Sequence, residues 1–194
     1  DFCFRLTDSI PLSADGFTFT IHADPDGASA LGGAGGFLGF SNIDNSLTVQ
    51  FDISKQAEDD SGNHVAININ GNISSDLDET AVSPNFDNGD LWCAWIIYEN
   101  GILDVYVDNS TSRPATPAIS QAVDIPAIIG QNTAHVGFTA STGNGAVNHD
   151  ITRWTFRPPA AIPTMGQWAL FLFGLVVLTL GSVGIWNVRQ MASV

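Results

Sequence analysis

Residues 47–71 have the sequence LTVQFDISKQAEDDSGNHVAINING, in which two alternating runs lie on either side of an acidic connection. In the first run, LTVQFDIS (47–54), apolar and polar residues alternate, so that Leu47, Val49 and Phe51 share one face. The second run, HVAINING (64–71), repeats this pattern. Alternation of this kind is typical of a β-strand with one face in the core, and it predicts a strand in each run.

The same pattern extends over residues 1–157. The segment LWCAWIIYENGILDVYVD (91–108) has Asn-Gly between two apolar runs, which is the strongest short signal for a β-hairpin. HVGFTAS (135–141) and HDITRWTF (149–156) supply further strands. No long amphipathic helix is found before residue 160. The predicted fold class is therefore all-β, as a sandwich.

Composition and charge narrow the range of functions. Of 194 residues, 13% are charged and 19 are glycine, which favours many short strands and turns over a helical bundle. The net charge of −14 excludes nucleic acid as a partner, because few basic residues are present to neutralise phosphates. The acidic residues are mainly aspartate, which is common in turns and in loops that bind hard cations.

Cysteine and tryptophan residues bear on the core. Cys3 and Cys93 are the only cysteines, and they could form a disulfide or remain separate strand residues. The sequence leaves both alternatives open. Trp92, Trp95 and Trp154 lie in strand-like runs, so we expect them to belong to the core rather than to a sugar-binding platform.

The composition changes after residue 157, where RPPAAIP begins a proline-rich linker over 158–167. Ala169 to Trp186 is an uncharged, mostly apolar run that would span ~27 Å as a helix, close to the thickness of a bilayer core. We predict a transmembrane helix at 168–188 and a short cytoplasmic tail at 189–194. The alternative is a buried helix, although a helix that is apolar on every face lacks a side for water.

The connection at 54–63 carries the clearest chemical signal. SKQAEDDSGN follows Asp52 and places several oxygen-bearing side chains in one short loop, as a Ca²⁺ site requires. An ordinary acidic surface loop is the alternative. The glycine-rich stretch 31–39 leaves backbone amides open to a ligand, but it lacks the Gly-Lys-Ser/Thr of a phosphate-binding loop.

Six motifs in order resemble the legume-lectin-like, or L-type lectin, domains: ADGFTF (14–19), GGFLGF (35–40), VQFD (49–52), DDSGNHVAI (59–67), VGFTASTG (136–143) and HDITRWTF (149–156). The resemblance implies a concanavalin-like jelly-roll sandwich of two antiparallel sheets over residues 1–157. The usual N-terminal strands would be missing, because the first residues already match the interior of such a domain.

The resemblance also implies a sugar site. Asp15, preceded by a cis peptide, would accept hydrogen bonds from sugar hydroxyls, and the backbone amide of Gly36 would donate one. Gln56 takes the place of an asparagine that touches both metal and sugar. Asn144 and Gly145 would supply further sugar contacts.

The implied metal site contains Ca²⁺ held by Asp52, Asp59, the Ser54 carbonyl and the Gln56 side chain. His64 would bind a neighbouring Mn²⁺ or other transition metal, with both aspartates bridging. Gln50 stands where plant lectins have a glutamate ligand, so this second site is expected to be weak. Ser54 also replaces an aromatic residue that stacks on the sugar ring.

The segment IPTMGQWA (162–169) resembles the IPTL-type C-terminal sorting signal of Gram-negative bacteria. This resemblance implies export, processing by an exosortase-like enzyme, and a protein anchored in the membrane or displayed at the cell surface.

Together these features predict a calcium-dependent lectin that binds glycans at a bacterial surface, for adhesion or matrix attachment, with a homodimer possible. A calcium-stabilised structural or adhesive module without a sugar site is the alternative. We do not expect an enzyme, because the three glutamates, Glu58, Glu79 and Glu99, do not form the carboxylate pair of a glycoside hydrolase.

Overall fold

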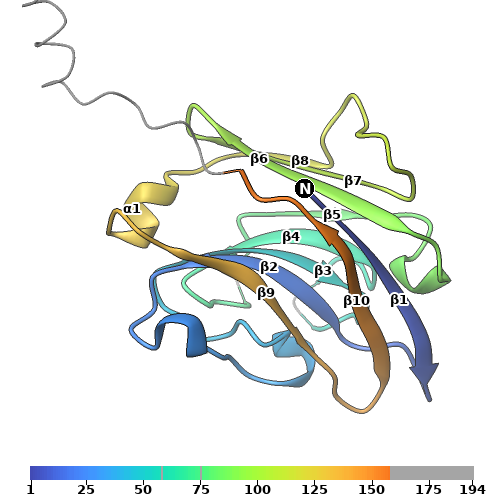
Figure 1. Ribbon diagram of the computed structural model, residues 1–194. Coiled ribbons are helices and arrows are strands. Elements are labelled where there is room, and N and C mark those ends of the chain that lie inside the picture. Colours follow the sequence, from blue (N-terminus) through green and yellow to red (C-terminus); the bar gives the residue numbers. More distant parts are fainter. Residues whose placement is uncertain (58, 75, 158–194) are drawn as a thin grey trace, which may run out of the picture. The chain divides into compact units, whose positions relative to one another are not determined.

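The described residues form ten strands in two antiparallel sheets (Figure 1). The computed structural model describes residues 1–57, 59–74 and 76–157. Sheet A has the order β10-β1-β6-β7-β8, and sheet B has the order β5-β4-β3-β2-β9. The strands are β1 (Phe2–Ile10), β2 (Gly16–His22), β3 (Ser46–Asp52), β4 (His64–Ile69), β5 (Asp78–Ala81), β6 (Trp92–Glu99), β7 (Ile102–Asp108), β8 (Ile119–Ala122), β9 (His135–Ser141) and β10 (Ala146–Trp154). The predicted two-sheet sandwich is confirmed.

Helices are short in this part of the chain. The one α-helix is α1 (Ile125–Ile129), and the 3-10 helices are η1 (Gly27–Ser29), η2 (Gly35–Phe37) and η3 (Phe86–Asn88). Asp124 caps α1 by accepting a hydrogen bond from the backbone amide of Ala127, as is usual at a helix N-terminus.

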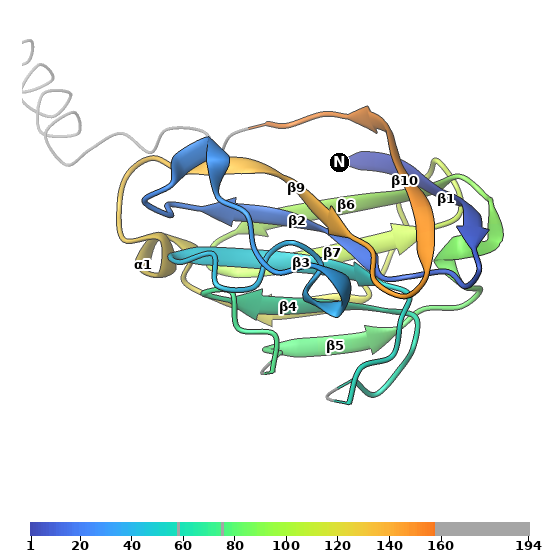
Figure 2. The same cartoon turned by 90° about the horizontal axis from the view of Figure 1, so that it is seen from below.

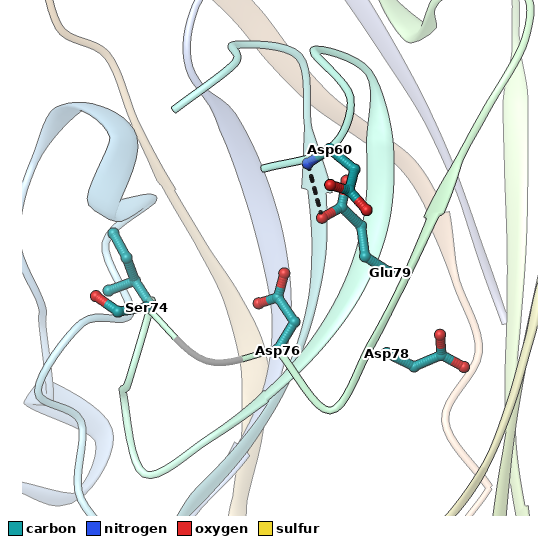
Figure 3. A pocket seen from close by; sticks show the side chains of 6 residues that line it. Asp60, Ser74, Asp76, Asp78 and Glu79 are labelled. Atoms are coloured by element: carbon teal, nitrogen blue, oxygen red, sulfur yellow. Dashed lines mark hydrogen bonds between the residues drawn. The ribbon is translucent and has the colours of Figure 1, made fainter. Parts of the chain in front are cut away.

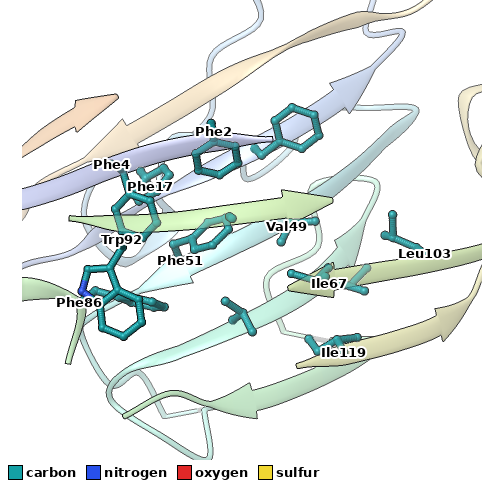
Figure 4. Packing of buried hydrophobic residues seen from close by; sticks show 14 of the residues in the cluster. Phe2, Phe4, Phe17, Val49, Phe51, Ile67, Phe86, Trp92, Leu103 and Ile119 are labelled. Atoms are coloured by element: carbon teal, nitrogen blue, oxygen red, sulfur yellow. The ribbon is translucent and has the colours of Figure 1, made fainter. Parts of the chain in front are cut away.

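Aromatic side chains fill the space between the sheets (Figure 4). The rings of Phe17 and Phe51 stack with their centroids 4.9 Å apart, and Phe4 meets Phe17 edge-on at 4.8 Å. Phe86 and Trp92 extend the cluster toward sheet A, as predicted for Trp92. Each such pair adds about 0.5–1.5 kcal/mol beyond the burial of its area, so the aromatic cluster is a main source of stability.

The predicted hairpin is the β6–β7 pair. Asn100 and Gly101 both have positive φ angles, of 52° and 80°, as a two-residue hairpin turn that matches the strand twist requires.

The structure also decides between the two alternatives for the cysteines. Cys3 and Cys93 lie opposite each other on β1 and β6 and form a buried disulfide.

The outer face of sheet B is covered by the connection between β2 and β3 (Figure 2). Leu38, Phe40 and Ile43 from this connection are buried in a second, smaller apolar cluster. Thr139 of β9 donates a hydrogen bond to the carbonyl of Leu38 at 2.8 Å, which fastens the connection to the sheet. Consequently both faces of β3 are buried, including its polar residues.

Trp95, which is half-buried and not part of the core cluster, differs from the prediction, and so does Trp154. The Trp154 side chain is 45% exposed, although its ring meets Phe138 edge-on at 5.2 Å. The reason is that β10 is the edge strand of sheet A, so Trp154, at the strand's end, has a neighbouring strand on one side only.

Residues Asp1–Phe156 form one compact unit. Within the described ranges, no helix is long and apolar enough to cross a membrane. The predicted linker at 158–167, the transmembrane helix at 168–188 and the tail at 189–194 lie outside the described residues. They remain predictions.

Candidate functional site

Two adjacent strands bring together the predicted metal ligands. Asp52 ends β3 and lies directly opposite His64, which begins β4. Asp59 reaches the same place from the connecting loop, and ligand atoms of the three side chains lie within 4.8 Å of one another. Asp52 and His64 are almost fully buried. The spacing suits a shared cation.

Burial makes the charge on Asp52 costly. It raises the pKa of the Asp52 carboxyl from 3.8 to about 8, although the backbone amide of Ser54, 2.6 Å from Oδ1, works in the opposite direction. Smaller contributions to the same increase in pKa come from the neighbouring carboxylates of Asp59, Asp15 and Asp76. A cation among these groups would favour the ionised form.

His64 presents an unbonded nitrogen to this cluster. Its Nδ1 lies 2.9 Å from the carbonyl oxygen of Ser61, which can only accept, so we assign the hydrogen to Nδ1 and a lone pair to Nε2. Nε2 is buried and has no hydrogen-bond partner among the described residues. A buried lone pair beside carboxylates is unfavourable without a cation, and imidazole with carboxylates is a common ligand set. The residues therefore fit a metal ion.

The other predicted calcium ligands lie beside this group. The backbone amide of Gln56 donates to Asp59 Oδ2 at 2.6 Å, which folds the loop back on itself. However, Gln56 Nε2 donates to the Ser54 carbonyl at 3.2 Å, so these two predicted ligands are bonded to each other. This hydrogen bond leaves Gln56 Oε1 and the second lone pair of the Ser54 carbonyl as possible oxygen ligands for Ca²⁺.

Asp15 lies next to the metal group, after a cis peptide that joins it to Ala14. Its backbone is held on both sides, by Ser141 through N–H···O of 3.2 Å and by Ile53 through N–H···O of 3.0 Å. Asp15 Oδ2 is buried and has no hydrogen-bond partner in the described part of the chain. Burial raises the pKa of the Asp15 carboxyl, and a hydrogen bond from the Ser54 side chain partly opposes this.

Glycines surround the carboxyl group of Asp15. A methyl group on Gly143 would lie 3.0 Å from Asp15 Oδ2, and one on Gly35 would lie 3.9 Å from it. A methyl group on Gly36 would lie 2.6 Å from Cδ of Gln56. The glycine loop, the loop after β3 and the β9–β10 turn therefore converge here, with only backbone beside Asp15 on two sides.

The predicted residues of the β9–β10 turn have different surroundings. Asn144 is exposed, whereas Gly145 packs against the Leu12 carbonyl, which a methyl group would approach to 2.4 Å. Of the two glycines in this turn, Gly143 is the one that lies against the Asp15 carboxyl group. Gly145 therefore has a packing reason to be glycine.

A chain of hydrogen-bonded polar side chains next to the metal group, two of them buried, was not predicted. Gln50 Nε2 donates to Asn68 Oδ1, and Asn68 Nδ2 donates to Asp76. Gln50 and Asn68 occupy the polar positions of their alternating strands, which was the available signal. The signal was ambiguous, because polar positions on a strand usually face water.

An acidic pocket of about 340 Å³ lies between β5 and the loops that precede β4 and β5 (Figure 3). Its lining residues are Asp60, Ile73, Ser74, Asp76, Asp78 and Glu79. Glu79 accepts hydrogen bonds from the backbone amides of Asp60 and Ser61, at 3.3 and 3.1 Å, and lies 3.7 Å from His64 Nδ1. Glu79 thus holds the loop that carries Asp59.

Comparisons with known proteins bear on the family and the fold of this chain. The family described as Legume lectin domain matches residues 1–167. Two Arabidopsis thaliana proteins, L-type lectin-domain containing receptor kinases VIII.2 and S.6, are 31% and 35% identical over 165 and 152 residues. These matches cover 80% and 74% of this chain, but only 23% and 21% of the two relatives.

A solved structure, that of basic winged bean lectin with Tn-antigen, is 26% identical and has a TM-score of 0.63. The match covers 77% of this chain and 65% of that lectin, so the chain spans less than two thirds of its length. With the two-sheet sandwich and the match over residues 1–167, the chain belongs to the legume lectin domain family.

Proposed function

We propose that this protein is a calcium-dependent lectin that binds carbohydrate through Asp15. The observation that carries the proposal is the buried, unpartnered Oδ2 of Asp15, flanked by Gly35 and Gly143 next to the cation group. A buried carboxylate oxygen needs a donor, and sugar hydroxyls are donors of suitable size for a site bordered by glycines.

The cation would be Ca²⁺ bound by Asp52 and Asp59, with the Ser54 carbonyl and the Gln56 side chain. A hard cation supplies positive charge that keeps buried carboxylates ionised and holds oxygen ligands in place. The loop from Ser54 to Asp59 would then be fixed, and it presents Gln56 against Gly36. The Gly36 amide would donate to the sugar, and Asn144 and Gly145 would contact it from the β9–β10 turn.

Legume lectin domains and their structural neighbours are in general non-enzymatic, and we propose the same for this chain. Two glutamates have positions unsuited to glycoside hydrolysis. Glu79 is bonded to backbone amides, and Glu99 ends β6 at the hairpin turn. Glu58 lies outside the described residues.

The location at a bacterial surface rests on the sequence of residues 158–194. We propose export, recognition of IPTM (162–165) by an exosortase-like enzyme, and anchoring through the apolar run when that run is not removed. A homodimer also remains a proposal. The glycans would be those of neighbouring cells or extracellular matrix.

Calorimetric titration of the calcium-loaded protein with galactose, N-acetylgalactosamine and mannose oligomers tests the function. We expect binding to at least one, abolished by chelator and by Asp15→Ala. Asp150→Ala, which removes an exposed carboxylate from β10, is the matched control and should bind as the parent does. The absence of heat with every sugar, or binding that is insensitive to chelator, would refute the proposal.

A second candidate is a structural or adhesive module that keeps calcium but has no sugar site. The hydrogen bond from Gln56 Nε2 to the Ser54 carbonyl favours it, because this contact holds the Gln56 amide in place without a ligand. In that case Asp52→Ala would still abolish the rise in melting temperature that calcium causes. The parent protein would bind no glycan, and Asp15→Ala would leave its melting temperature unchanged.

A further inference from the structure

Two histidines lie opposite each other at one end of sheet B. His22 ends β2 and pairs directly with His135, which begins β9. The two strands are neighbours, and β9 is the edge strand of the sheet (Figure 1). Asp15 precedes the other end of β2, about 20 Å away along the strand. The histidine pair is therefore separate from the candidate site described above.

Both imidazole rings present a nitrogen to the same turn of the β2–β3 connection, residues 24–27. His22 Nδ1 accepts a hydrogen bond of 3.3 Å from the backbone amide of Asp24. Because an amide can only donate, this nitrogen carries a lone pair. His135 Nε2 faces Gly27, where a methyl group would lie 3.4 Å from it. The Gly27 amide donates to the Asp24 carbonyl at 2.9 Å, which closes the turn.

The spacing of the two rings suits one metal ion. Their centroids are 5.4 Å apart. Zn²⁺ binds an imidazole nitrogen at about 2.0–2.1 Å, so that at the tetrahedral angle the centres of two bound rings are about 5.2 Å apart. The ring planes are inclined by 26°, and each ring would turn about its soft χ2 torsion to aim a nitrogen at the ion. Neither strand would have to move.

The charges around the pair favour a cation. Burial is the main cause that lowers the pKa of His22, with a smaller contribution from His135, while Asp24 acts in the opposite direction. At neutral pH the His22 ring is therefore neutral, and a metal would displace no proton from it. The Asp24 carboxylate accepts backbone hydrogen bonds from Asp26 and Asp44, both of 2.8 Å, which lower its pKa and fix its position.

We propose that His22 Nδ1 and His135 Nε2 bind a Zn²⁺ ion at the turn formed by residues 24–27. The Asp24 carboxylate supplies negative charge, and water completes the coordination. The ion replaces the Asp24 amide as the partner of Nδ1, since a hydrogen bond of 3.3 Å is longer than usual and is easily lost. Two imidazoles select a transition metal, whereas Ca²⁺ takes oxygen ligands, so the two sites differ in their ions.

Zinc at this position would join the edge strand β9 to the start of the connection that covers sheet B. The inference goes beyond the proposed function and does not depend on sugar binding.

Zinc titration of the full chain, kept in mild detergent and saturated with Ca²⁺, tests the inference. Bound Zn²⁺ is measured by equilibrium dialysis. His135→Ala and His22→Gln should each weaken one Zn²⁺ site at least about tenfold, because the loss of even a ligand's partner typically costs about 10–100-fold. Asn132→Ala, at an exposed position shortly before β9, is the matched control and should bind zinc as the parent does.

Histidine-selective NMR identifies the rings that bind. Zn²⁺ should shift the imidazole signals of His22 and His135 together, and the two variants assign these signals. His149, whose ring meets Phe17 edge-on at 6.4 Å, should not shift. A shift of the His64 signal at a different zinc concentration would report on the cation group beside Asp52, so the two sites can be told apart.

Two outcomes would overturn the inference: His22 and His135 signals that zinc leaves unchanged, or equal zinc binding by the parent and both variants. His135→Ala guards against misfolding, because His135 is exposed. If calcium-dependent glycan binding persists while zinc does not bind this pair, the proposed function stands and this inference fails.

Discussion

Calcium binding by this protein should release a proton and weaken steeply below pH 8. The cause is Asp52, whose pKa burial raises to about 8 in the absence of a cation. Calcium needs the carboxylate form, so the proton must leave when the ion binds. At neutral pH the calcium-free protein should therefore hold about one proton that calcium displaces.

The magnitude follows from the pKa. At pH 6, two units below it, about 99% of Asp52 is protonated, so the apparent calcium affinity should be about 100-fold below its high-pH limit. This factor corresponds to about 2.7 kcal/mol. Above pH 8 the affinity should rise by no more than about twofold.

Stability of the calcium-free protein should change in the opposite sense. The folded state binds the Asp52 proton more tightly than the unfolded state, whose pKa is near 3.8. The free energy of unfolding should therefore fall as pH rises from about 4 to about 8, by at most about 1.4 kcal/mol per pH unit. Calcium should remove this loss, so its effect on melting temperature should grow with pH.

Isothermal titration calorimetry at pH 6, 7, 8 and 9, in buffers with different ionisation enthalpies, measures affinity and proton release together. We expect release of about 0.9 proton at pH 7 and about 0.1 at pH 9. Asp150→Asn should behave as the parent. An affinity that stays constant from pH 6 to 9, with no proton release at pH 7, would refute the reasoning about Asp52.

Other predictions concern the core and the site. Phe51→Ala should lower the free energy of unfolding by about 3–5 kcal/mol, measured by urea denaturation, because it leaves a cavity in the aromatic cluster. Gly36→Ala should abolish glycan binding with little change in melting temperature, because its methyl group would displace the flexible Gln56 side chain; Gly137→Ala, which has open space, is its control. Reduction of the described disulfide should lower stability by about 2–5 kcal/mol in the same denaturation assay, since the bond closes a long loop.

The strands and the hairpin could be predicted because each signal was local. Alternation of apolar residues predicted β3 and β4, and Asn100-Gly101 predicted the turn between β6 and β7. The exposure of Trp154 could not be predicted in this way, because alternation indicates which face a residue occupies but not whether its strand lies at an edge. The disulfide also depended on the pairing of β1 with β6, which no local pattern encodes.

The acidic loop at 54–63 indicated a possible Ca²⁺ site by itself, but the individual ligands were predicted only through the ordered motifs. Asp52, Asp59 and His64 are separated in the sequence by a loop, so the sequence alone does not show that they are close in space. In the structure, ligand atoms of the three side chains lie within 4.8 Å of one another. The hydrogen bonds of Asn68 to Gln50 and Asp76 were not predicted, because these polar side chains need partners only when the β2–β3 connection buries that face of sheet B. Once that face is buried, each polar group on it must find a hydrogen-bond partner, and a network results.

The connection that covers sheet B also borders the candidate site at the end of β3. Residues 23–45 bury Leu38 and Phe40 against the sheet, and the same segment presents Gly35 and Gly36 to Asp15 and Gln56. Calcium would act on the other side of this contact, by fixing the loop that carries Gln56. In the proposed function, ion binding and the shape of the sugar site would therefore be coupled through the contact between Gly36 and Gln56. The coupling requires no movement of either sheet, because both participants are loops attached to a buried core.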